Sequence, residues 1–268
     1  MLELEHGFRV LDVHVELEPD ERRRRRSAAD PAGLERELHQ AGVVRALVFP
    51  PERERGYLKA NNAVARLSVD RPFVTLARIN GANDAGSGPG SRLRNLTASR
   101  ADHHTAPEDI EQYAYDERFA GFKLHPPADG LPDAEVLAEL ERVGLPVFTH
   151  GGRGFPPEAI EETLLAYDVP VVISHFGGYP LAADLMSNAI DLLERHDACH
   201  LDTSFVRYRD PLERAVMEHP DRVLFGSGAP ASHPNVAIME ILTLDVPEDA
   251  MRKVFTNNPE RVVAELRP

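Results

Sequence analysis

The sequence contains a single cysteine, Cys199, and no tryptophan. One cysteine excludes a disulfide within the chain and any cluster of thiolates around a metal ion. The sequence also lacks any apolar run near the roughly 20 residues that a membrane-spanning helix needs. Metal chemistry in this chain would therefore depend on histidine and carboxylate side chains.

Lysine is scarce as well, with Lys59, Lys123 and Lys253 alone, and the formal net charge is -14. A nucleic-acid-binding surface needs basic side chains for the phosphates, so this charge argues against nucleic acid as a partner. The opening MLELEHGFRV carries acidic residues where a signal peptide would be basic. We therefore expect a cytoplasmic protein that binds a small molecule and does not bind a membrane. The sequence leaves open whether the protein forms a homo-oligomer.

The length of 268 residues suits one α/β barrel, which takes about 250 residues in eight strand-helix units. Apolar runs typical of buried parallel strands alternate with amphipathic stretches typical of helices. The predicted strands are residues 8–14, 43–49, 72–79, 120–125, 146–150, 170–175, 199–205 and 222–227. In the first predicted helix, Asp30 and Pro31 mark the beginning and Gly42 the end.

This strand count predicts a single α/β domain over residues 1–268, a closed (β/α)8 TIM-type barrel. A doubly wound open sheet is the alternative, because a sequence does not show whether the strands close into a ring. Residues 81–106 follow the third strand and are rich in glycine and polar residues. We predict that they form an irregular insertion within the one domain.

Four predicted strands end in a histidine: His14, His125, His150 and His175. In a parallel barrel the carboxyl ends of all strands open onto one face, where active sites are assembled. Glu16 follows His14 by two residues, and residues i and i+2 of a strand point to the same side. These side chains are therefore expected to meet in one pocket.

Imidazole and carboxylate groups are suitable ligands for zinc and other divalent transition metals. We predict that His14, Glu16 and His150 bind one divalent metal ion, with zinc as the first candidate. Three protein ligands leave the open position that is typical of a catalytic zinc site. Glu16 has an alternative place in the charged loop that follows, ELEPDERRRRR.

Three further residues are candidates for binding a substrate: Lys123, His125 and Arg207. Lys123 precedes His125 by two residues, points to the same side of its strand and could hold an anionic group. The structural alternatives are a lysine paired with a carboxylate, and a histidine packed against the prolines that follow it.

Seven segments resemble, in chain order, the strand-end motifs of the amidohydrolase superfamily: LDVHVE, GFKLHPP, PVFTHGG, ISHFGG, LDTSF, VLFGSGAP and NNPERV. The resemblance covers residues 8 to 264, and it is to the amidohydrolase-2 branch, which includes aminocarboxymuconate-semialdehyde decarboxylase-like enzymes. It implies a metal ion held by a strand-one pair, by the strand-five histidine and by a strand-eight aspartate. It also implies that the strand-six histidine, here His175, orients or protonates the reacting group.

The chain departs from this pattern at two positions. Glu16 stands where the second histidine of the strand-one pair is expected, and Gly228 stands where the aspartate is expected. In the family that aspartate binds metal and handles the proton of the attacking water. Here Glu16 or His233 would take over those tasks, or the protein has ceased to be a hydrolase. Asp202 is predicted to lie within the seventh strand and not at its end.

The leading hypothesis is a metal-dependent hydrolase of the amidohydrolase-2 type, which acts on a small, anionic amide, ester or lactone. His175 and Glu16 would serve as its general acid or base. A metal-dependent, non-oxidative decarboxylase of an aromatic or dienoic acid is the first alternative, with Lys123, Arg153 and Arg207 available to hold the carboxylate.

A non-catalytic barrel that binds a small ligand is the second alternative. Gly228 supports it, because this residue supplies no carboxylate. The run from Arg22 to Arg26 could recruit an anionic ligand to the same face, or it could be a solvated run balanced by the acidic residues before it.

Overall fold

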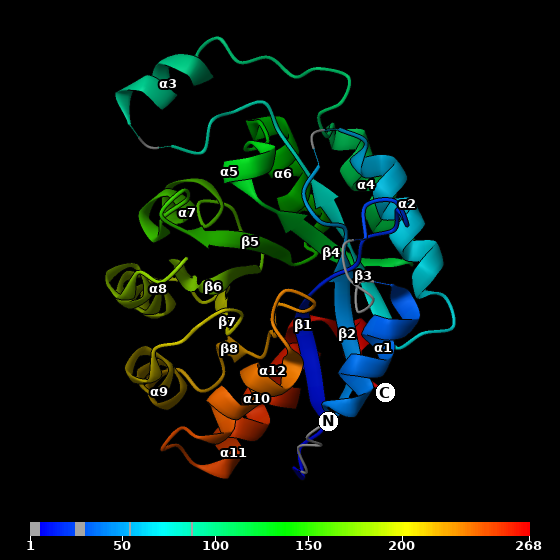
Figure 1. Ribbon diagram of the computed structural model, residues 1–268. Helices are drawn as coiled ribbons and strands as arrows, with labels where there is room; N and C mark the ends of the chain where they lie inside the picture. The colour runs from blue at the N-terminus through cyan, green and yellow to red at the C-terminus, as the bar shows by residue number, and fades with distance from the viewer. Residues whose placement is uncertain (1–5, 25–29, 54, 87) are drawn as a thin grey trace.

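The structure is a computed structural model that describes residues 6–24, 30–53, 55–86 and 88–268. Eight strands form one sheet in the order of the sequence, and each strand is parallel to the next. Helices surround this sheet in Figure 1. The strands are β1 (Val10–Glu16), β2 (Val43–Phe49), β3 (Phe73–Ile79), β4 (Phe119–Leu124), β5 (Val147–Gly152), β6 (Val171–Tyr179), β7 (Cys199–Asp202) and β8 (Val223–Leu224).

The ring of strands closes between β1 and the segment that follows β8. The amide of Val13 donates to the carbonyl of Phe225 at 2.9 Å, and the amide of Glu16 donates to Ala229 at 2.8 Å. The amide of Gly228 donates back to the carbonyl of His14 at 3.0 Å. These bonds confirm the predicted (β/α)8 barrel over the open sheet.

The helices alternate with the strands as the sequence predicts. The α-helices are α1 (Pro31–Gln40), α2 (Tyr57–Ser68), α3 (Pro89–Asn95), α4 (Pro107–Tyr115), α5 (Pro126–Asp129), α6 (Ala134–Val143), α7 (Pro157–Thr163), α8 (Ala183–Arg195), α9 (Arg209–Glu218), α10 (Pro234–Leu242), α11 (Glu248–Arg252) and α12 (Asn258–Val262). A π-helical turn (Lys253–Asn257) and a 3₁₀ turn (Ala264–Leu266) complete the C-terminal region. In the described part of the chain, every helix is too short or too polar to cross a membrane.

The boundaries of α1 follow the predicted capping residues. The Asp30 side chain accepts a hydrogen bond from the amide of Gly33 at 2.8 Å, and Pro31 occupies the first turn. At the other end, Gly42 adopts a φ of +81°, a conformation that glycine takes without steric cost.

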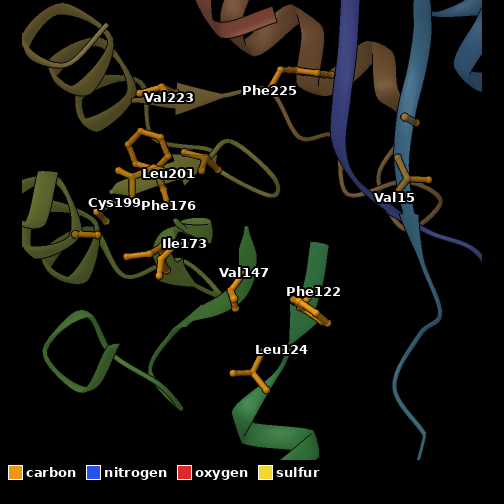
Figure 2. Packing of buried hydrophobic residues seen from close by; sticks show 14 of the residues in the cluster. Val15, Phe122, Leu124, Val147, Ile173, Phe176, Cys199, Leu201, Val223 and Phe225 are labelled. Atoms are coloured by element: carbon orange, nitrogen blue, oxygen red, sulfur yellow. The ribbon is translucent and has the colours of Figure 1, made fainter. Parts of the chain in front are cut away.

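The buried apolar side chains form two clusters, one inside the barrel and one between the strands and the helices. The inner cluster includes Leu11, Leu47 and Phe148 from the strands, and the C-terminal Leu266 joins it. The larger outer cluster contains side chains from successive strands, some of which Figure 2 labels, such as Ile173. Packing on both faces explains why the strands read as nearly continuous apolar runs.

The predicted insertion at 81–106 is present and contains the short helix α3, which stands apart from the barrel in Figure 1. Asn83 pairs with Leu131 in an isolated bridge, which ties the start of this segment to the chain after α5. The Asp84 carboxylate accepts hydrogen bonds from Arg94, and the Asn95 side chain also bonds to the Asp84 backbone. The sequence did not predict α3, because the helix has 7 residues and lies in a stretch rich in glycine and polar residues.

Candidate active site

A cavity of about 210 Å³ opens at the carboxyl ends of the strands. Histidines from four strand ends border it together with other polar and aromatic side chains. The lining residues are His14, Glu16, Phe49, Arg78, Lys123, His125, His150, His175, Tyr179, Phe205, Gly228 and Ala231. This position is the one where parallel barrels assemble active sites from different strands.

The predicted strand-end residues do meet there. The ring centroids of His14 and His175 are 4.9 Å apart, and those of His150 and His175 are also 4.9 Å apart. His125 stacks on His150 with a centroid distance of 4.2 Å. Glu16 borders the same space.

The described residues show contacts of two other predicted basic groups. Arg207 is outside the cavity lining, and its Nη1 donates to Glu240 Oε1 at 2.6 Å. Of the run after β1, Arg24 donates through Nε to the carbonyl of Glu18 at 3.0 Å, whereas Arg25 and Arg26 lie outside the described residues.

Asp202 corrects the expected position of the carboxylates. The predicted strand over 199–205 ends at Asp202 instead, so this carboxylate lies at the end of β7. Its Oδ1 accepts hydrogen bonds from the amides of Ser204, at 2.9 Å, and of His175, at 3.1 Å. The first of these bonds turns the chain away from the sheet, because an aspartate that bonds the amide two residues ahead stabilises a turn.

Asp202 and Ser204 determine which nitrogen of two histidines carries the proton. Asp202 Oδ2 lies 3.0 Å from His14 Nδ1, and a carboxylate accepts, so His14 Nδ1 donates. Ser204 donates its hydroxyl to Asp202 Oδ1, and its Oγ lies 2.8 Å from His175 Nδ1 and accepts from it. In the neutral form of both rings the lone pair is then on Nε2, and we assign it to the cavity side.

Burial keeps these imidazoles neutral. Desolvation, with the positive charge of Lys123 next, lowers the pKa of His14, and desolvation also lowers the pKa of His175 well below its usual value. The same cause lowers the pKa of His150 to about 2. Burial by itself raises the pKa of Asp202, but its interactions with His14, His175 and Lys123 outweigh this and keep it ionised. The site therefore presents neutral imidazoles beside a carboxylate.

The side chains at the cavity have the chemistry of ligands for a divalent ion. Among the described residues, the His150 ring has no hydrogen-bond partner, and neither does the carboxylate of Glu16, although both border a cavity. Neutral imidazole nitrogen and carboxylate oxygen suit zinc and manganese. Among the described residues, the group at this cavity with ligand atoms all within 4.8 Å of one another is His14, His175 and Asp202, whereas the predicted set of His14, Glu16 and His150 is not such a group.

Lys123 is a buried cation at the wall of the cavity. Its Nζ donates to Ser174 Oγ at 2.8 Å and lies 4.9 Å from the centre of the Phe49 ring. Desolvation lowers its pKa to about 8, and the nearby carboxylates oppose this effect. An ammonium group with unused donors can bind an anionic oxygen here.

Gly228 has no room for the aspartate that the sequence motif leads one to expect. Its φ is +74°, and a Cβ atom added there would lie 2.7 Å from the Phe205 ring. Phe205 itself has a φ of +57°, and its ring borders the cavity. An aromatic ring thus fills the space beside Gly228.

Sequence reasoning missed two residues of this site, Asp202 and Arg78. Asp202 lies in a mostly apolar run, so the sequence predicts that the strand continues past it. The segment LDTS does contain a turn signal, because an aspartate is followed two residues later by a serine. Arg78 belongs to the predicted strand PFVTLARI, and its charge near the carboxyl end of an apolar run is the signal that the sequence offers.

The fold is shared with solved structures of low sequence identity. An uncharacterized TIM-barrel protein from Bordetella bronchiseptica superposes with a TM-score of 0.69 at 20% identity, over 97% of this chain and 99% of that one. The 5-carboxyvanillate decarboxylase of Sphingomonas paucimobilis gives 0.65 at 14% identity, over 96% and 99%. A dihydroxybenzoic acid decarboxylase from Polaromonas sp. JS666, with bound manganese and the inhibitor 2-nitroresorcinol, gives 0.62 at 13% identity, over 97% and 98%.

A search of curated proteins finds none that matches the sequence. A model of the family described as Amidohydrolase matches residues 11–264, from the start of β1 to the C-terminal turn. This range contains the histidine-ended strands and the segment that closes the barrel. The chain therefore belongs to the amidohydrolase family, in the amidohydrolase-2 branch that its strand-end motifs resemble.

Proposed function

We propose that the protein is a metal-dependent hydrolase that acts on a small, anionic amide, ester or lactone. The observation that carries this proposal is a set of nitrogen and oxygen atoms at one cavity that could bind a metal ion and have no hydrogen-bond partner among the described residues. His150 and Glu16 have no hydrogen-bond partner among the described residues, and the bond from His14 to Asp202 leaves His14 Nε2 available. We assign His14, Glu16 and His150 as the ligands of one divalent ion.

Asp202 serves this site by orienting His14. Metal-binding histidines commonly donate their second ring nitrogen to a carboxylate, which fixes the ring and raises its basicity. Both Asp202 oxygens already accept hydrogen bonds, Oδ2 from His14 and Oδ1 from His175 and Ser204. This saturation favours the orienting role over direct binding through the set of His14, His175 and Asp202.

A bound divalent ion polarises a carbonyl and lowers the pKa of water to roughly 7. The chain supplies the remaining functions. His175, with its lone pair on Nε2, takes a proton from the attacking water and returns it to the leaving group. Lys123 holds an anionic group of the substrate, and the Phe49 and Phe205 rings exclude water from the wall.

Metal analysis tests this proposal most directly. Protein purified without added metal is expected to contain about one zinc or manganese ion per chain, measured by elemental analysis. Glu16→Gln and His150→Gln should each reduce that content, whereas His39→Gln, on the exposed surface of α1, is the matched control. Full metal content in both site variants would overturn the ligand assignment.

Non-oxidative decarboxylation is the second candidate, because Lys123 and His125 place a cation and a polar ring on the cavity wall, where a carboxylate could bind. The two reactions differ in their products. Release of carbon dioxide from aromatic or dienoic acids would favour decarboxylation, and cleavage of an amide, ester or lactone would favour hydrolysis. Absence of metal after incubation with zinc and with manganese would instead favour a ligand-binding barrel.

A further inference from the structure

Arg78, on β3, is a buried cation held at the cavity wall. Its Nε donates to Asp129 Oδ2 at 2.8 Å, and both side chains of this ion pair are almost fully buried. Its Nη1 donates to the carbonyl of Pro50 at 3.1 Å. The guanidinium plane is therefore fixed from two directions before any ligand binds.

Other contacts hold this ion pair in place. Tyr57 donates its hydroxyl to Asp129 Oδ1, and the Arg78 guanidinium lies 5.3 Å from the centre of the Tyr57 ring. Asn61 bonds to both backbone groups of Arg78, at 3.0 and 2.9 Å. The arginine thus has little freedom to turn toward a substrate.

What Arg78 does reach is His125. Its Nη2 lies 3.3 Å from His125 Nδ1. A guanidinium group is always charged and has no acceptor, so Nδ1 must be the acceptor in this bond. The ring proton then lies on Nε2, because a doubly protonated ring would place an N–H against the arginine N–H groups.

His125 is therefore opposite in tautomer to His14 and His175. Asp202 and Ser204 accept from Nδ1 of those two rings, whereas Arg78 donates to Nδ1 of His125. Around one cavity, two rings offer a lone pair and a third offers an N–H group. His125 Nε2 has no partner among the described residues, and its ring borders the cavity.

We propose that Arg78 is a positioning residue that fixes His125 as an Nε2–H donor, and that His125 and Lys123 together bind a carboxylate of the substrate. This inference rests on the proposed function only in its last part, the identity of the bound group. The Lys123 ammonium bonds to Ser174 and has further donors for an oxygen. Paired neutral and charged donors suit a carboxylate, which only accepts.

The tautomer is measured by long-range ¹H–¹⁵N NMR of the full-length protein labelled at histidine, after any paramagnetic ion has been exchanged for zinc. The His125 signals are assigned by their loss in His125→Gln. We expect the protonated nitrogen of His125 to be Nε2. A proton on Nδ1, or a ring that exchanges equally between both forms, would overturn the proposal.

Arg78 is tested with a pair of variants, because its removal alone would leave Asp129 as an unpaired buried charge. Arg78→Met combined with Asp129→Asn removes both charges, and Asp129→Glu alone, which keeps both charges, is the matched control. The double variant should lose the preference for Nε2–H, and the control should keep it. An unchanged tautomer in a folded double variant would show that Arg78 does not set it.

Benzoate serves as the carboxylate probe. Its addition should shift the His125 Nε2–H signal, and His125→Leu, which has no donor, should bind it about tenfold more weakly, the loss expected for one charge-assisted hydrogen bond. The double variant should bind it about twofold more weakly, because the Nε2–H form is then about half populated. Equal affinity in the parent and in His125→Leu would overturn the carboxylate assignment. Both readouts require no turnover, so they remain decisive even if the hydrolase proposal fails.

Discussion

At the scale of single residues, Gly228 is a position where the motif predicts the residue type and the structure shows why it differs. The family pattern leads one to expect an aspartate there, whereas the glycine adopts a φ of +74° with the Phe205 ring close by. We expect Gly228→Asp to lower the free energy of unfolding by about 1 to 3 kcal/mol, because the ring must move. Chemical denaturation measures this loss.

Two comparisons isolate the steric cause. Gly56 also has a positive φ, of +88°, but an added Cβ would meet nothing within 4 Å, so Gly56→Asp should cost less. Combining Gly228→Asp with Phe205→Ala should give a total loss smaller than the sum of the two single losses. Strictly additive losses would show that the ring is not what excludes the aspartate.

Asp202 offers a second residue-scale prediction. Asp202→Asn replaces the acceptor of the His14 Nδ1–H group by an amide, so His14 loses its fixed orientation. We expect zinc affinity to fall by about 10- to 100-fold, measured by competition with a chromophoric chelator. Asp210→Asn changes an exposed carboxylate and should leave the affinity unaltered. Unchanged affinity in Asp202→Asn would contradict the orienting role.

The site could be predicted in part from single residues. The strand-end positions of His14, His125, His150 and His175 were enough to place all four rings at one cavity. The ion pair of Arg207 could not be predicted in this way, because no local pattern reveals that Glu240 pairs with it. Contacts between residues distant in sequence decide which charges remain free.

At the scale of elements, the eight strands were predictable because most of their residues are buried and helix signals separate them. Their ends were less so. β7 ends three residues before the end of the predicted strand over 199–205, and β8 is reduced to Val223–Leu224. In both places hydrogen bonds to side chains or to irregular backbone replace the regular ladder between strands. The hydropathy of the sequence does not predict where this replacement begins.

The beginning of α1 provides a test at this scale. Asp30→Ala removes the side-chain acceptor for the Gly33 amide, so we expect a loss of about 1 kcal/mol in the free energy of unfolding. Asp30→Ser retains an acceptor and should cost less. Urea denaturation of the three proteins measures the difference, and equal stabilities would mean that packing alone sets where α1 begins.

At the scale of the whole molecule, buried neutral histidines link stability to pH. Burial lowers the pKa of His200, near the start of β7, from 6.5 to about 4. Below pH 6.5 the unfolded chain therefore binds a proton that the folded protein does not take up until about pH 4. Stability must fall as the pH falls through this window.

His200→Asn removes this titration. From about pH 7.5 to about pH 5, the parent should lose roughly 1 to 2 kcal/mol more than His200→Asn. Urea denaturation at each pH gives the comparison, and parallel curves for the parent and His200→Asn would contradict a neutral buried ring.

The joint that closes the barrel has a dynamic consequence. β8 contributes two strand residues, and beyond them the ring is joined by separate bonds from the amides of Val13, Glu16 and Gly228. An irregular seam of this kind opens at a lower free-energy cost than the long ladder between β5 and β6. These three amides should therefore exchange with deuterium sooner than those of β5. His14 and Glu16 belong to the same seam, so a ligand that binds them should slow the exchange of these amides. The exchange rate at the seam would then report whether the cavity at the carboxyl ends of the strands is occupied.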